Sequence, residues 1–465
     1  MKRFTFITRT LLVALSITSL STMAQRVGGF QNERAIEDYS KLKDSTYLAW
    51  QNVIKYLSLD KQRNSYLSFG GSIRTRFEHV THRFWMPDTV ENYYSQRLAF
   101  HADIHFGKQF RFFGELQSGY KTQGEAFLQT DDIDVHQGFL AFKPNASNLS
   151  FRFGRQEMRL GTGRLVDFGL GPNVRRTFDM GKITYSDGDV NIQAYYGKEV
   201  QLGFRAFDND FMFFQENAPN PMIWGIYSQF SAFPNGGEGT NTELYYLGIE
   251  SGRAVYNDVA GREIRHSIGI RRFGKAGPRF TYNTELIYQF GDISTNAISA
   301  FNVETDWKYT LIHKKWRPSF GLKLDWSSGD SEPGDGKINS FNPMYVNPAI
   351  YSLAAVNTPI NLVSFHPTFT VFPTRKLMVQ LEFATFNRSS KNDGLYSPPN
   401  RQTRMANGIS DKHIGNTMGL FVVYTFSPYL SFNLRTSYFE IGNFLEETGP
   451  SESIFQFAPT LEVKF

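Results

Sequence analysis

Hydrophobic and polar residues alternate along most of the chain. The clearest stretch is the C-terminal FQFAPTLEVKF (455–465), in which every second residue is apolar or proline and the residues between are mainly polar or charged. Strict period two over this length predicts a β-strand with one apolar and one polar face. At about 3.3 Å per residue, a tilted strand of this length can cross a bilayer.

The same alternation recurs throughout the chain, and charges of both signs occupy the polar face. A soluble β-sandwich would turn the apolar face towards a core, whereas long strands with a charged second face favour the apolar-out, polar-in wall of a membrane barrel. We count about eighteen such segments between residues 67 and 465, and bacterial single-chain barrels have even strand numbers. Clear examples are residues 67–78, 97–106, 280–290, 320–326 and 377–384.

The connections between these segments alternate between short and long. Two connections, 232–242 and 309–316, are longer than the other short ones. Sorting of this kind predicts an all-β fold, a single transmembrane antiparallel β-barrel of about 18 strands over residues 67–465, with short periplasmic turns and long extracellular loops. The short connections are 107–109, 143–148, 186–188, 372–376 and 427–429, and the long ones are 121–131, 159–175, 198–221, 328–360 and 387–416.

The N-terminus has the features of an export signal. Lys2 and Arg3 precede the apolar LLVALSITSL (11–20), and Thr22-Met23-Ala24 provides small residues for cleavage before Gln25. The apolar core is too short to span a bilayer comfortably. We therefore expect a signal peptide over 1–24, so the protein is periplasmic, secreted or an outer-membrane barrel. Together with the barrel pattern, this predicts the bacterial outer membrane.

Residues 25–66 form the predicted periplasmic N-terminal segment. Within it, SYLAWQNVIKYLSL is expected to be a short amphipathic helix or partly extended, in the periplasm or against the inner mouth of the barrel. No second domain is expected.

Composition narrows the functional classes. Aromatic residues make up 16% of the chain although the mean hydropathy is only −0.37, because they are interleaved with polar residues. There is no cysteine and hence no disulfide. The net charge of +5, from 49 basic and 44 acidic residues, is too small to indicate nucleic-acid binding.

The strongest candidate chemistry is the basic stretch FRFGRQEMRLGTGRL (151–165). It lacks the Lys-Ser/Thr of a P-loop and the spacing of a dinucleotide fingerprint. Alternation turns Arg152 towards the lumen and Arg155 towards lipid, where an arginine costs a few kcal/mol. We therefore expect a bulge or a strand exit at Gly154, which would turn Arg155 inward.

The residues leave two interpretations of this basic region open. One is an arginine constriction that binds anionic groups, since guanidinium pairs carboxylates bidentately. The other is a solvated extracellular loop whose arginines pair with local acids or lipopolysaccharide. The arginines concerned are Arg155, Arg159, Arg164, Arg175 and Arg176.

Other polar clusters carry less chemistry. His101, Asp103 and His105 share one strand face, which favours a polar lumen wall over a metal site. Carboxylates of the loop SSGDSEPGDGK (327–337) could bind calcium, but the spacing is not that of an EF-hand and a turn-rich loop is favoured. There is no G-x-S-x-G nucleophile elbow. We expect no cofactor and no catalysis, although a third hypothesis, an outer-membrane enzyme or adhesion module, stays open.

Several motifs in order resemble the alginate export family. They are KYLSLD (55–60), YLSFGGSIRTRFE (66–78), FRFGRQEMRLGTGRLVD (151–167) with RRTFD (175–179), DWSSGDSEPGDGKINSFNPMY (325–345), and the closing LEVKF. Together they span nearly the whole mature chain.

The resemblance implies an outer-membrane barrel that passes an anionic uronate polysaccharide through an arginine-lined pore, with possible periplasmic export partners. The terminal strand ending in Phe465 also resembles the signal read by the barrel assembly machinery. A general or sugar-acid-selective porin for uptake is the alternative, because the inward-facing strand charges are roughly balanced. Matching arginines are Arg74, Arg76, Arg152, Arg155, Arg159 and Arg164, and Arg175 and Arg176 are added from charge alone.

Overall fold

The computed structural model describes residues 30–44, 50–126, 128–214, 220–231, 240–351 and 355–465. The predicted signal peptide therefore lies outside the described residues.

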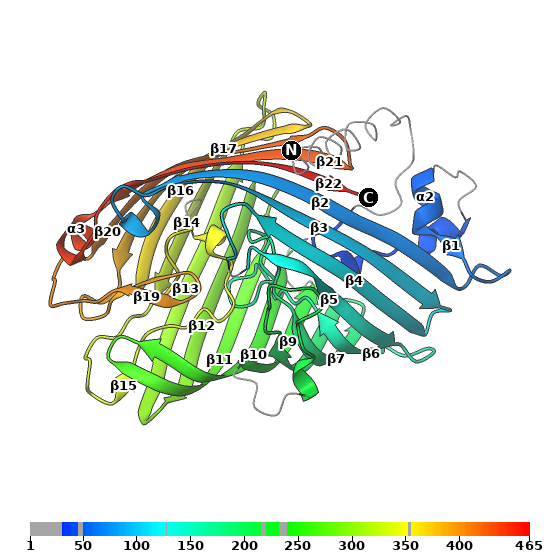
Figure 1. The fold of residues 1–465 in the computed structure, drawn as a ribbon, viewed down its shortest axis with the longest axis horizontal. Helices are drawn as coiled ribbons and strands as arrows, with labels where there is room; N and C mark the ends of the chain where they lie inside the picture. Colours follow the sequence, from blue (N-terminus) through cyan, green and yellow to red (C-terminus); the bar gives the residue numbers. More distant parts are fainter. Residues whose placement is uncertain (1–29, 45–49, 127, 215–219, 232–239, 352–354) are drawn as a thin grey trace.

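The described chain forms one closed antiparallel β-barrel of eighteen strands, which confirms the predicted fold class. The first strand, β2, pairs with the last, β22, so the sheet has no free edge (Figure 1). The strands are β2 (Tyr66–Thr81), β3 (Val90–Phe106), β4 (Phe110–Lys121), β5 (Asp131–Phe142), β6 (Leu149–Gln156), β7 (Phe178–Asp187), β8 (Val190–Glu199), β9 (Met222–Ser231), β10 (Asn241–Tyr256), β11 (Val259–Ala276), β12 (Phe280–Ile293), β13 (Asn296–Thr310), β14 (Ser319–Ser327), β16 (Leu362–Thr374), β17 (Leu377–Arg388), β20 (His413–Thr425), β21 (Leu430–Ile441) and β22 (Ile454–Lys464).

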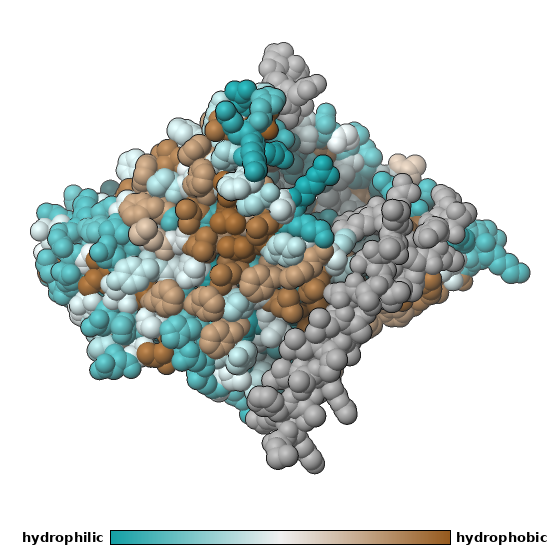
Figure 2. Space-filling view, turned by 90° about the horizontal axis from the view of Figure 1, so that it is seen from above, coloured by the Kyte–Doolittle hydropathy of each residue, from teal (hydrophilic) through white to brown (hydrophobic). Residues whose placement is uncertain are grey.

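The outer face of the wall is apolar, as the alternation predicts. Large hydrophobic side chains at every second position remain exposed, and Figure 2 shows them gathered in the middle of the wall with hydrophilic residues towards its ends. An apolar band flanked by polar ends matches the hydrocarbon layer of a bilayer. Examples from around the wall are Phe100, Leu140, Phe153, Ile226, Leu286, Phe320, Leu381 and Met418.

The connections are sorted by length with two exceptions. The turns at 257–258 and 294–295 are tight although they lie on the side of the long loops. Both join neighbouring strands that continue pairing up to the turn, so no residues are left for a loop. The long loops also contain the short elements η4 (Arg83–Trp85), η5 (Met212–Phe214), β15 (Lys337–Ile338), η6 (Pro348–Ile350), β18 (Leu395–Ser397), β19 (Arg401–Arg404) and α3 (Asn443–Thr448).

The lumen holds a hydrophobic core of its own. Residues of the loop between β6 and β7 (Leu165, Val166) and of the loop between β14 and β16 (Phe341, Tyr345) pack against inward side chains such as Tyr245. Loops that bury apolar side chains in this way are fixed parts of the lumen.

The N-terminal segment lies at the opposite end of the barrel, where the short turns are. It comprises η2 (Arg34–Ile36), η3 (Ser40–Asp44), α2 (Trp50–Lys55) and β1 (Leu57–Ser58), and β1 pairs with β2. Figure 1 shows α2 and β1 beside the start of β2. Among the described residues, the helices are all too short or too polar to span a membrane.

Candidate functional site

The loop between β6 and β7, residues 157–177, crosses the lumen; we call it the inner loop. Its Arg164 is buried and reaches the far wall, where it contacts Glu304 of β13 and donates to Asp325 of β14 at 3.1 Å. Glu285 of β12 lies 3.8 Å away. One guanidinium therefore ties the loop to three carboxylates.

The same loop is anchored to the opposite wall by Arg74 of β2. The Arg74 guanidinium donates to the carbonyl oxygens of Leu170 and Pro172 at 2.7 and 2.6 Å and to Asn173 Oδ1 at 2.8 Å. Arg76 adds a bond to the Gly171 carbonyl. The inner loop is thus held between the two sides of the barrel.

The loop between β14 and β16 (328–361) supports the inner loop from the side. Tyr345 donates its backbone N–H to the Leu165 carbonyl at 2.8 Å and accepts from Asp167 at 3.0 Å. Asn347 donates to the Gly163 carbonyl. The two loops therefore form one hydrogen-bonded unit inside the barrel.

Further arginines of the inner loop pair with local acids. Arg159 lies 3.2 Å from Asp167, and Arg176 donates to Glu199 at 2.7 Å. Burial raises the pKa of the Asp167 carboxyl, and the Arg159 charge opposes that rise. Arg175 donates to Glu157 at 3.1 Å. These arginines brace the loop.

The expectation that Arg155 turns inward is wrong. Gly154 does adopt φ +131, and a Cβ there would lie 2.3 Å from the Gly138 carbonyl, but strand pairing continues through it without a shift. Arg155 therefore shares the outer face with the exposed Phe153. Its charge is neutralised by Asp179 at 2.9 Å.

Residues of the loop between β8 and β9 cover this outward arginine. The Asp210 carbonyl accepts a bond from Arg155, and the Met212 N–H donates to Asp179. Phe213 stacks on Phe153 with ring centroids 5.5 Å apart. The loop and Asp179 together shield Arg155 from lipid. Arg155 can therefore stay on the outer face that the alternation assigns to it, without a bulge at Gly154.

Two cations lie directly opposite each other on β2 and β3. Arg74 and Arg97 are cross-strand partners, and both are almost fully buried. Arg97 lies 3.2 Å from Glu462 of β22, which is also the cross-strand partner of Arg74, so the two arginines share one carboxylate. Like charges opposite each other destabilise a sheet.

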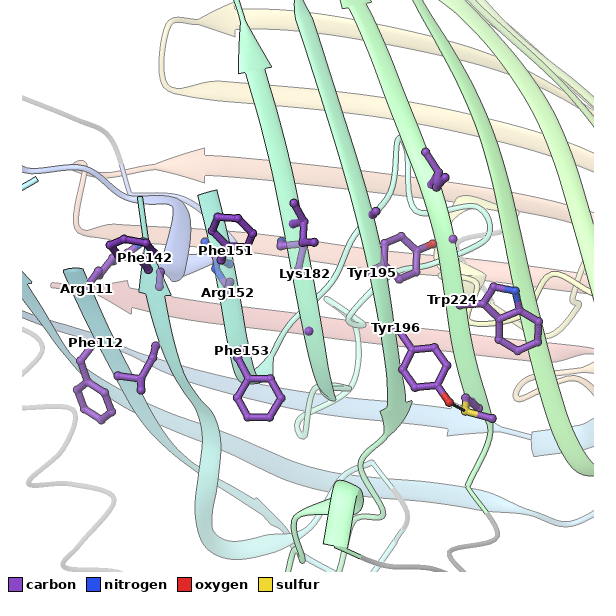
Figure 3. Close-up of a pocket in the computed structure, with 18 of the residues that line it drawn as sticks. Arg111, Phe112, Phe142, Phe151, Arg152, Phe153, Lys182, Tyr195, Tyr196 and Trp224 are labelled. Carbon is purple, nitrogen blue, oxygen red and sulfur yellow. Dashed lines mark hydrogen bonds between the residues drawn. The ribbon is translucent and has the colours of Figure 1, made fainter. Parts of the chain in front are cut away.

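A second set of cations forms a row across the wall, which we call the cationic row: Arg111 of β4, Arg152 of β6 and Lys182 of β7. The register places Arg111 and Arg152 opposite the same residue, Ala141, and Arg152 opposite Lys182. Figure 3 shows the three side chains in succession across these strands. Arg111 pairs with Asp103, whereas no carboxylate lies within 4 Å of Arg152 or Lys182 among the described residues.

The N-terminal segment faces this row. Glu33 is the acid that interacts electrostatically with both Lys182 and Arg152, and the Asn32 carbonyl accepts from Arg175 at 2.9 Å. Ala35 is buried against Phe113 and Phe139 of the lumen wall. The segment therefore enters the barrel from the end with the short turns and reaches the base of the inner loop.

The C-terminus holds this segment in place. The Phe465 carbonyl accepts from the Arg34 guanidinium at 2.8 Å and from the Lys55 ammonium at 3.2 Å. The first and last described parts of the chain thus meet at the mouth.

The structure divides the predicted arginines into different surroundings. Arg74, Arg76, Arg159, Arg164, Arg175 and Arg176 belong to the inner loop or its anchors, Arg152 belongs to the cationic row, and Arg155 lies outside the lumen. Sequence reasoning missed Lys182 and the opposition of Arg97 to Arg74. The pairs Arg152–Lys182 and Arg74–Arg97 both depend on the register between neighbouring strands, which no local sequence pattern shows.

The two other polar clusters singled out in the sequence lie in the barrel wall and in a loop. His105 and Arg111 both contact Asp103, which is a polar lumen network. In the loop 327–337, burial beside Asp393 raises the pKa of Asp330 to about 6.

A closed barrel of eighteen strands with an apolar outer belt and a charged, loop-filled lumen defines the class of outer-membrane β-barrel channels. Within that class, the chain belongs to the alginate export family, which it matches over residues 65–458. The family and the fold together place it in the bacterial outer membrane as a multi-pass barrel.

Solved structures of Pseudomonas aeruginosa proteins share the fold at low identity. OccK2 (OpdF) in complex with glucuronate is 11% identical, with a TM-score of 0.56 over 86% of this chain and 98% of that one. OccK9 (OpdG) is 11% identical with a TM-score of 0.58, and the outer membrane protein opdK is 11% identical with a TM-score of 0.57, each with the same coverage. No curated protein matches the chain.

Proposed function

We propose that the channel passes an anionic uronate polymer, or a related anionic solute, along the cationic row by guided diffusion. The observation that carries this proposal is the opposition of Arg152 and Lys182 on neighbouring strands without an acid in salt-bridge range among the described residues. Neighbouring strands lie about 4.8 Å apart, so the two charges repel each other. A passing carboxylate relieves that repulsion.

The spacing of charges on a uronate polymer suits a row of cations. A uronate polymer carries a carboxylate on each sugar, so it can exchange one group for the next along several weak sites. The family to which the chain belongs, alginate export, supports a uronate. The structural neighbour OccK2, whose complex contains glucuronate, agrees with that chemistry.

The arrangement of the lumen supports a closed state. The inner loop is tied to both walls, and the N-terminal segment sets Glu33 against the cationic row where the solute carboxylate would sit. We infer that opening requires withdrawal of this segment. Transport itself needs no cofactor.

A second candidate is uptake of small sugar acids. Glucuronate in the OccK2 complex is a single uronate, and the same cationic row suits a monomer as well as a polymer. Deleting the gene distinguishes the two directions. If the channel exports polysaccharide, the deletion strain should fail to secrete it. If the channel takes up sugar acids, the deletion strain should fail to grow on them.

Recording in planar bilayers tests the channel. We expect anion-selective conductance that uronate oligomers block, and we expect the double variant Arg152→Ala/Lys182→Ala to lose most of the selectivity and the block. Arg155→Ala is the matched control, because this arginine lies in the same strand as Arg152 but on the outer face. Equal selectivity of the double variant and the wild type would contradict the proposal.

A further inference from the structure

Three metal-ligating side chains converge at the base of the inner loop, outside the cationic row, and a fourth lies beside them. Glu115 of β4, His136 of β5 and Glu157 each place one ligand atom within 4.8 Å of the others. All three are at most 5% exposed. His136 Nε2 lies 2.8 Å from Glu157 Oε1 and 3.9 Å from Glu115 Oε1.

A fourth ligand comes from β3. His101 is 2% exposed, and its Nδ1 lies 3.9 Å from Glu115 Oε2. Within the described ranges, this Nδ1 has no hydrogen-bond partner, and neither has Glu115 Oε2 or Glu157 Oε2. Buried polar atoms are normally paired, so unpaired atoms on three neighbouring buried side chains point to a missing ligand.

The local strand geometry explains why the four lie near one another. A bulge at His136 interrupts the pairing of β4 with β5, so that His136 and Gln137 together oppose one position of β4. His101 is the direct cross-strand partner of Glu115. Glu157 follows β6 immediately and is held by a bond from its N–H to Gln137 Oε1.

The donor set selects the kind of ion. Two imidazoles and two carboxylates suit Zn²⁺ and related transition metals, whereas Mg²⁺ and Ca²⁺ prefer oxygen alone. With Zn–N and Zn–O bonds of about 2.1 Å, tetrahedral ligands lie roughly 3.4 Å apart. His136 lies 2.8 Å from Glu157 and 3.9 Å from Glu115, and His101 lies 3.9 Å from Glu115, so these pairs are near that spacing. His101 is outside the group of three whose ligand atoms all lie within 4.8 Å, so binding requires it to move towards His136 and Glu157.

Charge points the same way. Arg175 is the cation that hydrogen-bonds to this pair of carboxylates, Glu115 and Glu157. It donates to Glu157 Oε1 and leaves Glu157 Oε2 without a partner among the described residues. Gln137 approaches Glu115 Oε1 at 3.5 Å but carries no charge. Glu115 therefore has no cationic hydrogen-bond partner among the described residues, although the charge of Arg175 reaches it and that of Arg97 reaches Glu157.

We propose that Glu115, His136, Glu157 and His101 bind one divalent transition-metal ion of the Zn²⁺ type. The ion replaces the proton between His136 and Glu157. It joins the first residue of the inner loop to β3, β4 and β5, so it stabilises the closed arrangement of the loop without taking part in transport.

The test is metal binding by the full chain purified in detergent. After chelator treatment and dialysis against ZnCl₂, we expect one equivalent of zinc by mass spectrometry, and Co²⁺ should give the visible absorption of a tetrahedral site. His136→Ala should weaken binding by more than tenfold. His105→Ala is the matched control, because His105 faces the lumen in the same strand as His101 but contacts Asp103 instead.

Folding of each variant is checked by its heat-dependent mobility in gels. If His136→Ala does not fold, Glu157→Gln replaces it, since it keeps the shape of the side chain and lies outside the strands. Zinc or cobalt binding that is weak in the wild type, or equal in the His136 or Glu157 variant and the His105 variant, would overturn the proposal. Weak binding in the wild type would mean that a proton satisfies the cluster, and equal binding by the two variants would mean that the metal binds elsewhere.

Discussion

The lumen wall changes its character between β7 and β8. On one side lie Arg152 and Lys182 of the cationic row, and the next residue in register, Tyr195 of β8, is already part of the hydrophobic cluster. On that second side, Tyr245 and Leu247 pack against the inner loop. One row of the wall is therefore charged in its first part and apolar in its second.

The difference teaches how a barrel can hold a loop and still pass ions. Burying a large apolar side chain stabilises the folded protein by about 1.5–3 kcal/mol, and no solute in water competes for that contact. A cation in the lumen, by contrast, can exchange one anion for another at little cost. We infer that the apolar half fixes the inner loop and that the charged half is the path.

The largest expected effect comes from removing the loop's anchor on the far wall. Arg164→Met leaves Glu285, Glu304 and Asp325 buried without their shared cation. Breaking a buried ion pair from one side costs about 3–5 kcal/mol. We expect the free energy of unfolding in detergent to fall by roughly that amount, with noisy conductance as the loop loosens.

Arg159→Met is the control for this change. Its side chain is one-third exposed, and without it Asp167 keeps the Gly169 N–H and the charges of Arg175 and Arg176. Its effect should therefore be clearly smaller than that of Arg164→Met. If both variants unfolded at the same denaturant concentration, the far-wall anchor would not be what fixes the loop.

A smaller effect is expected from displacing the N-terminal segment. Ala35 is fully buried between Phe113 and Phe139, so Ala35→Glu cannot keep the segment in place. Conductance should rise several-fold while the barrel stays folded. Ile36→Glu adds the same charge to the neighbouring residue, which is 56% exposed, and should leave conductance unchanged. A closed Ala35→Glu channel would show that the segment does not obstruct the path.

The alternation of apolar and polar residues predicted the barrel because it can be seen in each strand separately. Alternation with period two can be recognised within a single strand. Because one face of each strand meets lipid and the other meets the polar lumen, the alternation is strict, as in residues 320–326. The same rule placed Arg152 inside correctly. It also placed Arg155 outside, and the expectation of an exception at Gly154 was the error.

The site was harder to predict because its contacts are long-range. Arg74 meets residues about a hundred positions away, and Arg164 meets Asp325 across the barrel. Whether an arginine in a basic loop is a brace or part of a path depends on which acid the fold brings to it. Neither composition nor spacing carries that information.

The smallest expected effect is a pH dependence of the N-terminal segment. Burial, with the Arg34 charge adding to it, lowers the pKa of Lys55 from its ordinary 10.5 to about 7. A released segment would regain the ordinary pKa, so docking expels a proton between pH 7 and pH 10.5. Docking therefore strengthens as pH rises through that window and is independent of Lys55 below it.

Conductance at pH 6.5 and pH 9 measures this directly. We expect the wild type to close more often at pH 9, and Lys55→Met to remove the difference, because methionine fills the same space without a proton to lose. Lys41→Met, at an exposed position of the same segment, should keep the wild-type dependence. A pH response that persists in Lys55→Met would mean that another group controls docking, with Glu37 and Asp103 the charged neighbours of Lys55 to replace next.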